Sequence, residues 1–497
     1  MEHSDHGLDQ SSLVSIYLLS FLVNTSSVHL RVVMFWELWV RNNLKWSCVI
    51  ADNYVAGLDR TSSKREEPDQ SVYRRKTVKH IAAIAVFIIV GTGVSGGVRT
   101  QEPTLGWPQW GGPARNFHVD AGSIARIWPE SGPRQLWRRS LGEGYSAILV
   151  DGNVLVTMYR SNEREVVVAL DAETGITKWE FAYAAPLTRN GYFDVWFNAA
   201  GPGPYSSPVI ADGVVFSVGV NGHFHALDLV TGRLVWSHNL VDLFKLDNYN
   251  AFASSPLVYD RTVILPLGGS SRGVVAFEQD SGSVVWHSDE FPLAPGSPLL
   301  IRLDGKDQLV VVGQQMLAGL GPDDGRLLWT HPHENELGLN VSMPIWGDDD
   351  RLFISSAYDG GSRMVHLRQV DNQTITEEIW ATNRMRLHFG NALRLGELLI
   401  GSSGDFGPAF LTAVNASSGE EVWRDRSFAR AHLLHSNDVI IITDEDGEIA
   451  VASVSQQGLD VHARKVVLTE NAWTPPTLVD GRLYLRDRRD IVALDLR

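Results

Sequence analysis

From about residue 134 onward, the chain consists of short alternating apolar runs separated by tight-turn signals. One unit, residues 205–240, reads YSSPVIADGVVFSVGVNGHFHALDLVTGRLVWSHNL. Its four apolar runs, PVIA, VVFSV, FHALDL and RLVWSH, are separated by Asp-Gly, Asn-Gly and Val-Thr-Gly. Asp-Gly and Asn-Gly between alternating runs are strong hairpin signals, because tight hairpin turns need positive φ. The unit is therefore predicted to form a four-stranded antiparallel meander.

The end of this unit recurs along the chain as a fixed pattern, in which a small residue is followed six positions later by Gly and ten positions later by Trp. The clearest copies are ALDAETGITKW (169–179), ALDLVTGRLVW (226–236), AFEQDSGSVVW (276–286), GLGPDDGRLLW (319–329) and AVNASSGEEVW (413–423). A period of about 40 to 50 residues indicates a repeat architecture. Four-stranded sheets that pack face to face around an axis form a β-propeller, in which each unit is one blade.

The recurring pattern has a mechanical interpretation as a docking device between blades. We expect the Asp228 carboxylate to cap the turn and Gly232 to supply its backbone freedom. Trp236 is expected to act as a wedge whose indole N–H reaches a backbone carbonyl of the next blade. Ala226 is small and leaves room for a neighbouring ring.

Counting the docking tryptophans gives the number of blades. They are Trp179, Trp236, Trp286, Trp329, Trp380 and Trp423. A degenerate seventh unit, ASVSQQGLDVH, follows, and the last unit stops at Arg497 before its Gly and Trp. The segment PRQLWRRSL (133–141), with Trp137, resembles GRLVWSHNL and precedes the first full unit. The sequence thus predicts an all-β, monomeric eight-bladed β-propeller closed by its N-terminal strand, which removes open sheet edges.

The N-terminal part has a different character. RRKTVKH (74–80) precedes IAAIAVFIIVGTGVSGGV (81–98), which carries no charge. A basic flank followed by an apolar run predicts an export signal or a membrane anchor across residues 74–98, with the rest of the chain outside the cytoplasm. Whether the segment is cleaved stays open. Residues 1–73 are interpreted as a poorly defined extension from a gene start placed too far upstream. The alternative is a real second hydrophobic hairpin, in which SSLVSIYLLSFLV (11–23) is another membrane segment.

Charge and cysteine content narrow the possible partners. The formal net charge of −15 argues against a nucleic-acid partner, and the repeat region shows no basic stripe. Cys48 is the only cysteine, which excludes an intrachain disulfide and a haem attachment motif.

The docking pattern Ala-x-Asp-x-x-x-Gly-x-x-x-Trp resembles the pyrroloquinoline-quinone (PQQ) repeat, found in quinoprotein alcohol dehydrogenases and in the non-catalytic outer-membrane assembly scaffold BamB. WPQWGGPARNF (107–117), LGEGYS (141–146), SSPLV (254–258) and the ending AWTPPTLVDGRLYLRDRRDIVALDL are similar to a group of exported bacterial PQQ-like repeat proteins. The resemblance covers residues 105–497 and implies the propeller fold. For the dehydrogenases it implies a vicinal disulfide, a calcium held by Glu, Asn and Asp, and an Asp base. No such set is assignable here, so no catalytic residue, metal or cofactor is predicted.

Two connections are long enough to serve as a binding surface, 184–208 and 239–256. Both join an outer strand to the next inner strand, so we expect them on the same face of the disc, binding an envelope protein or a small ligand. The alternative function is a PQQ-dependent oxidoreductase with calcium that acts on an alcohol or sugar; the alternative for the loops is insertion drift. The candidate side chains are Arg189, Asn190, Tyr192, Asp194, Trp196, Asn198, Asp247, Asn248 and Tyr249.

Other polar clusters have structural interpretations. DEDGE (444–448) lies where a hairpin turn belongs, although its acids allow a calcium site. HPHENE places His331 and His333 in a loop expected to be solvated, with a zinc pair as the alternative. HFH, with His223 and His225, is predicted to pack within a strand. AHLLH, with His432 and His435, is predicted to begin an inner strand and to approach the central channel.

Overall fold

The computed structural model describes the backbone of residues 17–25, 28–36 and 47–50, and it describes residues 106–497 except for 187–200, 247–250, 268–272, 290 and 406. The chain divides into two units, residues 1–99 and 100–497. In the first, β1 (Tyr17–Thr25) pairs antiparallel with β2 (Val28–Trp36), which pairs with β3 (Ser47–Ile50). The predicted signal or anchor at 81–98 lies outside the described residues. Within them, no helix has the length and apolar character needed to cross a membrane.

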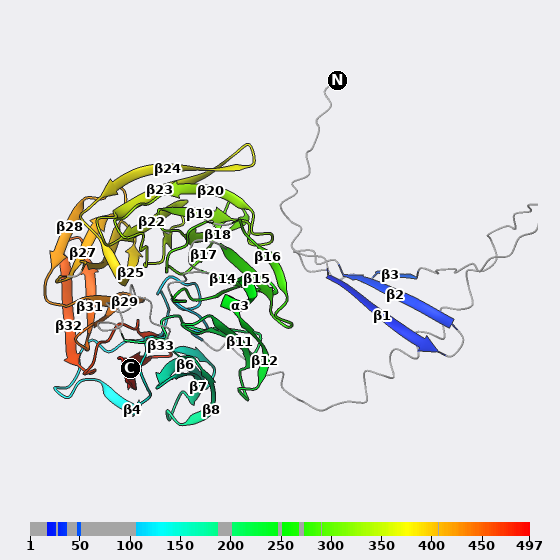
Figure 1. Ribbon diagram of the computed structural model, residues 1–497, viewed down its shortest axis with the longest axis horizontal. Helices are drawn as coiled ribbons and strands as arrows, with labels where there is room; N and C mark the ends of the chain where they lie inside the picture. The colour runs from blue at the N-terminus through cyan, green and yellow to red at the C-terminus, as the bar shows by residue number, and fades with distance from the viewer. Residues whose placement is uncertain are drawn as a thin grey trace, which may run out of the picture. The chain divides into compact units, whose positions relative to one another are not determined.

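The second unit is a ring of eight four-stranded antiparallel sheets, as the sequence predicts (Figure 1). The strands are rich in apolar residues, and many of the turns carry Gly, Asp or Asn residues with positive φ. Blades 1 to 4 are β5 (Leu149–Asp151), β6 (Val154–Ser161), β7 (Arg164–Asp171), β8 (Thr177–Ala184); β9 (Val209–Ala211), β10 (Val214–Val218), β11 (His223–Asp228), β12 (Leu234–Asn239); β13 (Leu257–Tyr259), β14 (Thr262–Pro266), β15 (Val274–Glu278), β16 (Val284–His287); β17 (Leu299–Leu303), β18 (Lys306–Val312), β19 (Met316–Leu320) and β20 (Leu327–Pro332).

The remaining blades continue the same order around the ring. Blades 5 to 8 are β21 (Ile345–Trp346), β22 (Arg351–Ser356), β23 (Gly361–Val370), β24 (Gln373–Thr382); β25 (Leu387–Leu395), β26 (Leu398–Ser403), β27 (Phe410–Asn415), β28 (Glu421–Asp425); β29 (Ala431–Ser436), β30 (Val439–Asp444), β31 (Glu448–Ser455), β32 (Gly458–Val466); β33 (Thr477–Val479), β34 (Arg482–Arg486), β35 (Asp490–Asp495) and β4 (Arg134–Ser140).

The eighth blade confirms the predicted closure. Strand β4, from the start of the propeller, pairs antiparallel with β35 at its end, from Arg134 opposite Asp495 to Ser140 opposite Asp490. Trp137 lies opposite Ala493 in this pair, and its indole N–H donates to the Ala172 carbonyl of blade 1 at 3.1 Å. The two ends of the propeller chain therefore share one sheet.

The docking tryptophans join neighbouring blades almost as predicted. The Trp179 indole N–H donates to the Leu229 carbonyl of the next blade at 2.9 Å, and Trp236, Trp286, Trp380 and Trp423 make the equivalent bond. The glycine of the next turn packs on the ring, because a Cβ added at Gly232 would lie 2.5 Å from Trp179. The ring beside Ala226 belongs to its own blade, since Ala226 is the cross-strand partner of Trp236.

Trp329 is the exception to the predicted bond. Its indole N–H donates to the Gln308 side chain of its own blade at 2.7 Å, and Gln308 donates in turn to Thr374 of blade 5. The turn of blade 5 between β23 and β24 lacks the Gly of the docking pattern.

Buried serines link the starts of the inner strands around the axis. The Ala147 N–H donates to the Ser207 hydroxyl oxygen, the Ser207 N–H to that of Ser255, and the Ser255 N–H to that of Ser297. Each bond is 2.9 to 3.0 Å long and joins one blade to the next. The recurring Ser-Ser-Pro and Gly-Ser-Pro sequences thus satisfy backbone groups that would otherwise be buried without partners.

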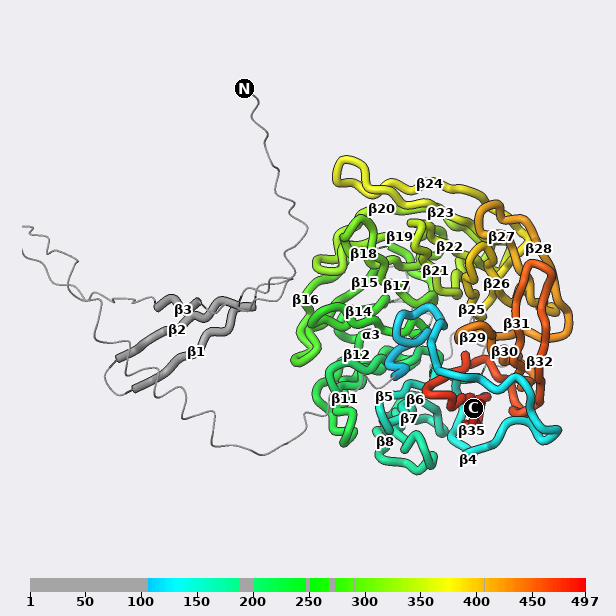
Figure 2. The backbone as a smooth tube through the Cα atoms, turned by 180° about the vertical axis from the view of Figure 1, so that it is seen from behind, coloured from blue at the N-terminus to red at the C-terminus, as the bar shows by residue number. Residues whose placement is uncertain are grey.

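Strand direction separates the two faces of the disc. The connections from outer strand to next inner strand emerge on one face, here called the connector face, together with the turns between the second and third strands. The other turns, including the docking turns, form the turn face. Residues 106–133 cross the disc on the turn face before the chain enters β4 (Figure 2). There Trp107 bridges to Val150 of blade 1, and the Val119 N–H donates to the His435 carbonyl of blade 7.

Candidate functional site

The side chains predicted to form the binding surface lie in residues 187–200 and 247–250, outside the described residues. What the structure does describe is where their connectors begin and end. Both leave an outer strand and return to an inner strand, β8 to β9 and β12 to β13, so both emerge on the connector face, as predicted. The second connector begins with a helix that the sequence analysis missed, α3 (Leu240–Phe244), whose first turn is capped by the Asn239 side chain.

A buried ion pair holds the base of the first connector. Arg160 donates to the Ala185 carbonyl at 2.7 Å and to the Pro202 carbonyl at 3.2 Å, which brings both ends of the connector together. Its guanidinium lies 3.1 Å from the Glu165 carboxylate, and the two side chains are 2% and 0% exposed. Charge-assisted hydrogen bonds of this kind are stronger than neutral ones, so the two ends of the first connector are held firmly against the blade.

The Glu165 carboxylate is also held by its other neighbours. It accepts a hydrogen bond from the Tyr183 hydroxyl at 2.9 Å and one from the Val220 N–H at 3.2 Å. Burial and the nearby carboxylate raise the pKa of Tyr183 well above its usual value, so Tyr183 stays a donor. A Cβ at Gly219 would lie 2.1 Å from Glu165, so glycine is needed for this approach.

Aromatic side chains from four blades gather at the mouth of the central channel on the connector face. Phe389 and Trp473 have ring centroids 4.8 Å apart, and Tyr145 and Trp473 5.3 Å apart. His388 lies 4.7 Å from Phe389 and hydrogen-bonds Tyr358. We call these five residues the aromatic arc. Tyr145 and Trp473 precede the inner strands β5 and β33, His388 and Phe389 lie near the start of the inner strand β25, and Tyr358 lies between β22 and β23.

Charged groups surround the arc and fix its orientation. The Arg430 guanidinium lies 5.0 Å from the Phe389 ring centroid, a cation–π contact, and 3.1 Å from the Glu445 carboxylate. Glu445 also accepts the Trp473 indole N–H at 2.9 Å. Burial raises the pKa of Tyr145 to about 12, so its hydroxyl is neutral at physiological pH. Half-buried aromatic rings beside arginine are typical of protein-binding hot spots.

The sequence analysis missed the arc, because its members lie far apart along the chain and meet only when the ring closes. Two members lie in segments that carry the resemblance to PQQ-like repeat proteins: Trp473 is part of AWTPPTLV, and Tyr145 is part of LGEGYS. These two residues share a position just before an inner strand, which the other members of the arc do not have. No spacing rule links them, since each blade contributes one or two.

The predicted histidine clusters have different outcomes. His331 and His333 are buried, not solvated as expected, because β20 extends to Pro332 and the His333 ring bonds the Ser356 hydroxyl at 2.8 Å. His225 packs within β11, as predicted, and burial lowers its pKa to about 3. His432 begins the inner strand β29, as predicted; its ring bonds the Trp473 carbonyl at 2.9 Å, and burial lowers its pKa to about 4.

The structure also describes the two remaining polar sites, His435 and the DEDGE segment. His435 faces the segment that crosses the axis, and its Nδ1 lies 3.1 Å from that of His118. DEDGE forms the turn between β30 and β31, as expected. There the Asp444 carboxylate accepts the N–H groups of Asp446, Glu448 and Ala429.

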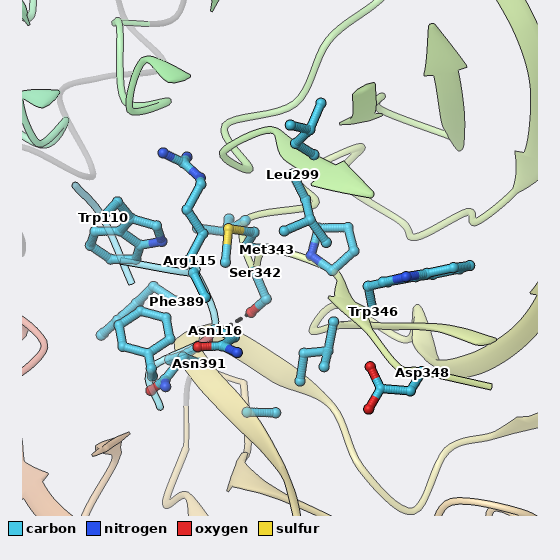
Figure 3. A pocket seen from close by; sticks show the side chains of 18 residues that line it. Trp110, Arg115, Asn116, Leu299, Ser342, Met343, Trp346, Asp348, Phe389 and Asn391 are labelled. Atoms are coloured by element: carbon cyan, nitrogen blue, oxygen red, sulfur yellow. Dashed lines mark hydrogen bonds between the residues drawn. The ribbon is translucent and has the colours of Figure 1, made fainter. Parts of the chain in front are cut away.

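A cavity of about 190 Å³ lies on the axis, between residues 114–117 and the inner strands of blades 4 to 6 (Figure 3). Phe389 of the aromatic arc forms part of its wall. Ligand pockets for drug-sized molecules usually measure about 300–1,000 Å³, so this cavity suits a smaller group.

The vicinal disulfide that the resemblance to the dehydrogenases implies beside the quinone has no counterpart in this chain. No three His, Cys, Asp or Glu side chains in the described part of the chain are grouped as metal ligands. The only cysteine of the chain, Cys48, precedes the propeller, so no vicinal disulfide can form beside the channel. The Trp473 ring is already in contact with two aromatic neighbours.

Comparison with known proteins places this architecture among PQQ-like repeats. Residues 193–407 match the family model described as outer membrane protein assembly factor BamB. The quinoprotein ethanol dehydrogenase of Pseudomonas putida is 31% identical over 180 residues, covering 30% of this chain and 27% of that protein. BamB of Yersinia pestis is 26% identical over 275 residues, covering 51% of this chain and 64% of that protein. The chain thus matches less than two thirds of the length of each.

Solved structures share the fold. BamB from Moraxella catarrhalis superposes with a TM-score of 0.52 at 18% identity, covering 73% of this chain and 97% of that one. A europium-containing methanol dehydrogenase gives 0.56 at 14% identity, with 78% and 89% covered. At such identities the likeness concerns the fold alone, which scaffolds and enzymes share.

Proposed function

We propose that this chain, a PQQ-like repeat propeller related to both BamB and the quinoprotein alcohol dehydrogenases, is a non-catalytic binding protein of the bacterial envelope. Its connector face binds a partner protein. The observation that carries the proposal is the aromatic arc, where half-buried rings of Phe389 and Trp473 lie beside Arg430 at the channel mouth. Aromatic and arginine side chains dominate the binding energy of protein interfaces.

The anchored first connector is a second observation in favour of the connector face as the binding surface. Arg160 ties the two ends of the first connector to the blade, so the residues between them are presented from a rigid base. A preorganised loop loses less conformational entropy on binding. The predicted residues of both connectors, from Arg189 to Asn198 and from Asp247 to Tyr249, extend this surface in the proposal. The predicted signal at 74–98 and the similarity to an outer-membrane assembly factor support export of the chain.

Replacing residues 187–200 by a short Gly-Ser linker tests the role of the first connector. The Ala185 and Pro202 carbonyls remain, so the Arg160 anchor and the fold are expected to persist. Binding of the partner that the intact protein co-purifies from envelope extracts should be lost, while substitution of Val230, which is exposed on the turn face, should leave it intact. Unchanged binding without residues 187–200 would remove this connector from the proposed surface.

The second candidate function is a PQQ-dependent oxidoreductase with calcium that acts on an alcohol or sugar. The observations that favour it are the similarity to ethanol dehydrogenase and the position of Trp473 at the channel mouth. Titration with PQQ and calcium separates the two functions, because a ligand that binds the folded state raises the melting temperature. The binding-protein proposal predicts no shift. A clear shift together with dye reduction by an alcohol would overturn it.

A further inference from the structure

Two histidines from distant parts of the propeller sequence face each other on the turn face. His118 lies in the segment that crosses the disc (Figure 2), and His435 lies near the end of β29, the inner strand of blade 7. Their Nδ1 atoms are 3.1 Å apart, whereas their ring centroids are 4.9 Å apart, so the rings approach each other through their Nδ1 edges. Both residues keep part of their surface exposed.

The backbone holds the two rings in this arrangement. The Val119 N–H donates to the His435 carbonyl at 3.0 Å, and the His435 N–H donates to the Phe117 carbonyl at 2.9 Å. These two bonds flank His118 and make it the parallel bridge partner of His435. The rings therefore meet without any rearrangement of the backbone, and a ligand that contacts both would bind a preorganised pair.

The separation of the two nitrogens suits a metal ion that is shared by the rings. Zinc–nitrogen bonds of about 2.0–2.1 Å at the tetrahedral angle place two ligand nitrogens about 3.3–3.4 Å apart. The observed 3.1 Å between the Nδ1 atoms is close to that value. The competing arrangement is a direct hydrogen bond, in which one ring donates its Nδ1–H to the other.

The chemical state of the rings also suits a cation. Burial lowers the pKa of both rings, that of His118 to about 4, so both are neutral at pH 7. Neutral imidazole is the form of histidine that binds metal ions. When each ring carries its proton on Nε2, the two Nδ1 lone pairs face each other, and a cation between them replaces their repulsion by two bonds.

The surroundings of the pair define the kind of ion. In the described part of the chain, no third His, Cys, Asp or Glu joins the two histidines. The Asp438 carboxylate, which acts on the His435 ring, is paired with Arg126. A bound ion would therefore keep water at its other positions. Imidazole nitrogens suit Zn²⁺, Ni²⁺ and Cu²⁺, whereas Ca²⁺ and Mg²⁺ prefer oxygen ligands.

We propose that His118 and His435 bind a divalent transition-metal ion, such as Zn²⁺, through their Nδ1 atoms. One ligand comes from the crossing segment and the other from blade 7, so the ion joins the two. The ligands are 317 positions apart in the sequence, and a metal ion that links such distant residues stabilises the folded state. The site lies on the turn face and does not depend on the proposed function.

Thermal unfolding of the full chain, after removal of metal ions with EDTA, tests the proposal. Zn²⁺ and Ni²⁺ are compared with Ca²⁺ and Mg²⁺ at equal concentration and ionic strength. The transition-metal ions should raise the melting temperature, because they bind the folded state, and Ca²⁺ and Mg²⁺ should not. No rise with either transition-metal ion, or an equal rise with Ca²⁺, would overturn the proposal and leave the pair as a hydrogen bond.

Variants assign the effect to this pair, because other histidines of the chain also bind metal ions. His118→Gln and His435→Gln each remove one ligand and keep a side chain that can form a hydrogen bond. Each should weaken Zn²⁺ binding, measured by isothermal titration calorimetry, by about tenfold or more, since even loss of an outer partner of a ligand costs about 10- to 100-fold. His287→Gln changes an exposed histidine of blade 3 and should bind Zn²⁺ as the unchanged protein does.

The double variant tests whether the two rings share one ion. It should bind Zn²⁺ no more weakly than either single variant, because each substitution already breaks the same chelate. If His435→Gln, which lies within β29, does not fold, His118→Gln alone decides. Undiminished Zn²⁺ binding in His118→Gln would contradict the site, and additive losses in the double variant would contradict a shared ion.

Discussion

At the residue scale, one glycine per docking turn meets two demands at once. Gly232 has a φ of +68° and lies against the Trp179 ring, so a side chain there meets both backbone strain and a steric clash. Gly213 has a φ of +76°, but a Cβ added there would meet nothing within 4 Å. The sequence predicted the turn role of Gly232 from its Asp-x-x-x-Gly spacing. It did not predict the ring contact, which depends on the neighbouring blade.

Substitutions at Gly213 and Gly232 allow backbone strain and the steric clash with the ring to be measured separately. Gly213→Ala should lower the free energy of unfolding by about 1–2 kcal/mol through left-handed backbone strain alone. Gly232→Ala should cost about 1–3 kcal/mol more, because the methyl group overpacks the Trp179 ring. Chemical denaturation of both variants is the measurement. Equal losses would show that the ring moves aside at no cost.

A second prediction concerns the contribution of Glu165 to the free energy of unfolding. Glu165→Gln leaves the Arg160 charge buried without its counterion, which costs about 3–5 kcal/mol of the free energy of unfolding. Glu163→Gln, two residues away and exposed, should change it by less than about 0.5 kcal/mol. Limited proteolysis should also cut the first connector faster in Glu165→Gln, because its base is released. A stable variant with an unchanged cleavage rate would contradict the anchoring role.

At the element scale, the strand that closes the ring was predictable, whereas the segment that crosses the axis was not. PRQLWRRSL carries the same apolar pattern and tryptophan as the outer strands, so the sequence identifies β4 as the missing strand of the last blade. WPQWGGPARNF and the helix α3 follow no repeat pattern. Their positions come from contacts with distant blades, which periodicity does not encode.

The closing tryptophan should matter more than the last docking tryptophan. Trp137→Ala removes a ring that is 8% exposed, packs on Gly175 and holds blades 8 and 1 together, and it should cost about 3–5 kcal/mol. Trp423→Ala removes the same kind of hydrogen bond from a more exposed ring that faces a degenerate turn, so the loss should be smaller. Thermal unfolding of both variants decides. A smaller loss for Trp137→Ala would argue against closure by β4.

At the scale of the whole molecule, burial of histidines ties stability to pH. Burial lowers the pKa of His225, His333 and His388 to about 3, and that of His432 to about 4. In the unfolded chain a histidine titrates near 6.5, so between these values the unfolded state binds more protons. The stability from keeping each ring neutral is complete above the unfolded pKa and falls as the pH drops.

Acidification should therefore destabilise the propeller well before its carboxylates are protonated. From pH 6.5 downward, each such histidine should contribute a slope of up to about 1.4 kcal/mol per pH unit. Denaturation curves between pH 7 and pH 4.5 measure the total slope. His333→Gln should reduce that slope, while replacement of an exposed acidic residue such as Asp446 should not. A free energy of unfolding that does not change with pH over this range would contradict the claim that these histidine rings are buried in their neutral form.

The ring as a whole also creates the connector face, and the central claim concerns what that face does. A photo-reactive amino acid at Asn471, exposed beside Trp473, and at Val230, exposed on the turn face, reports contacts of the two faces in intact cells. The account predicts a discrete cross-linked partner from position 471 and none from position 230. Cross-linking from position 230 alone, or from neither position while PQQ raises the melting temperature, would contradict a binding role for the connector face.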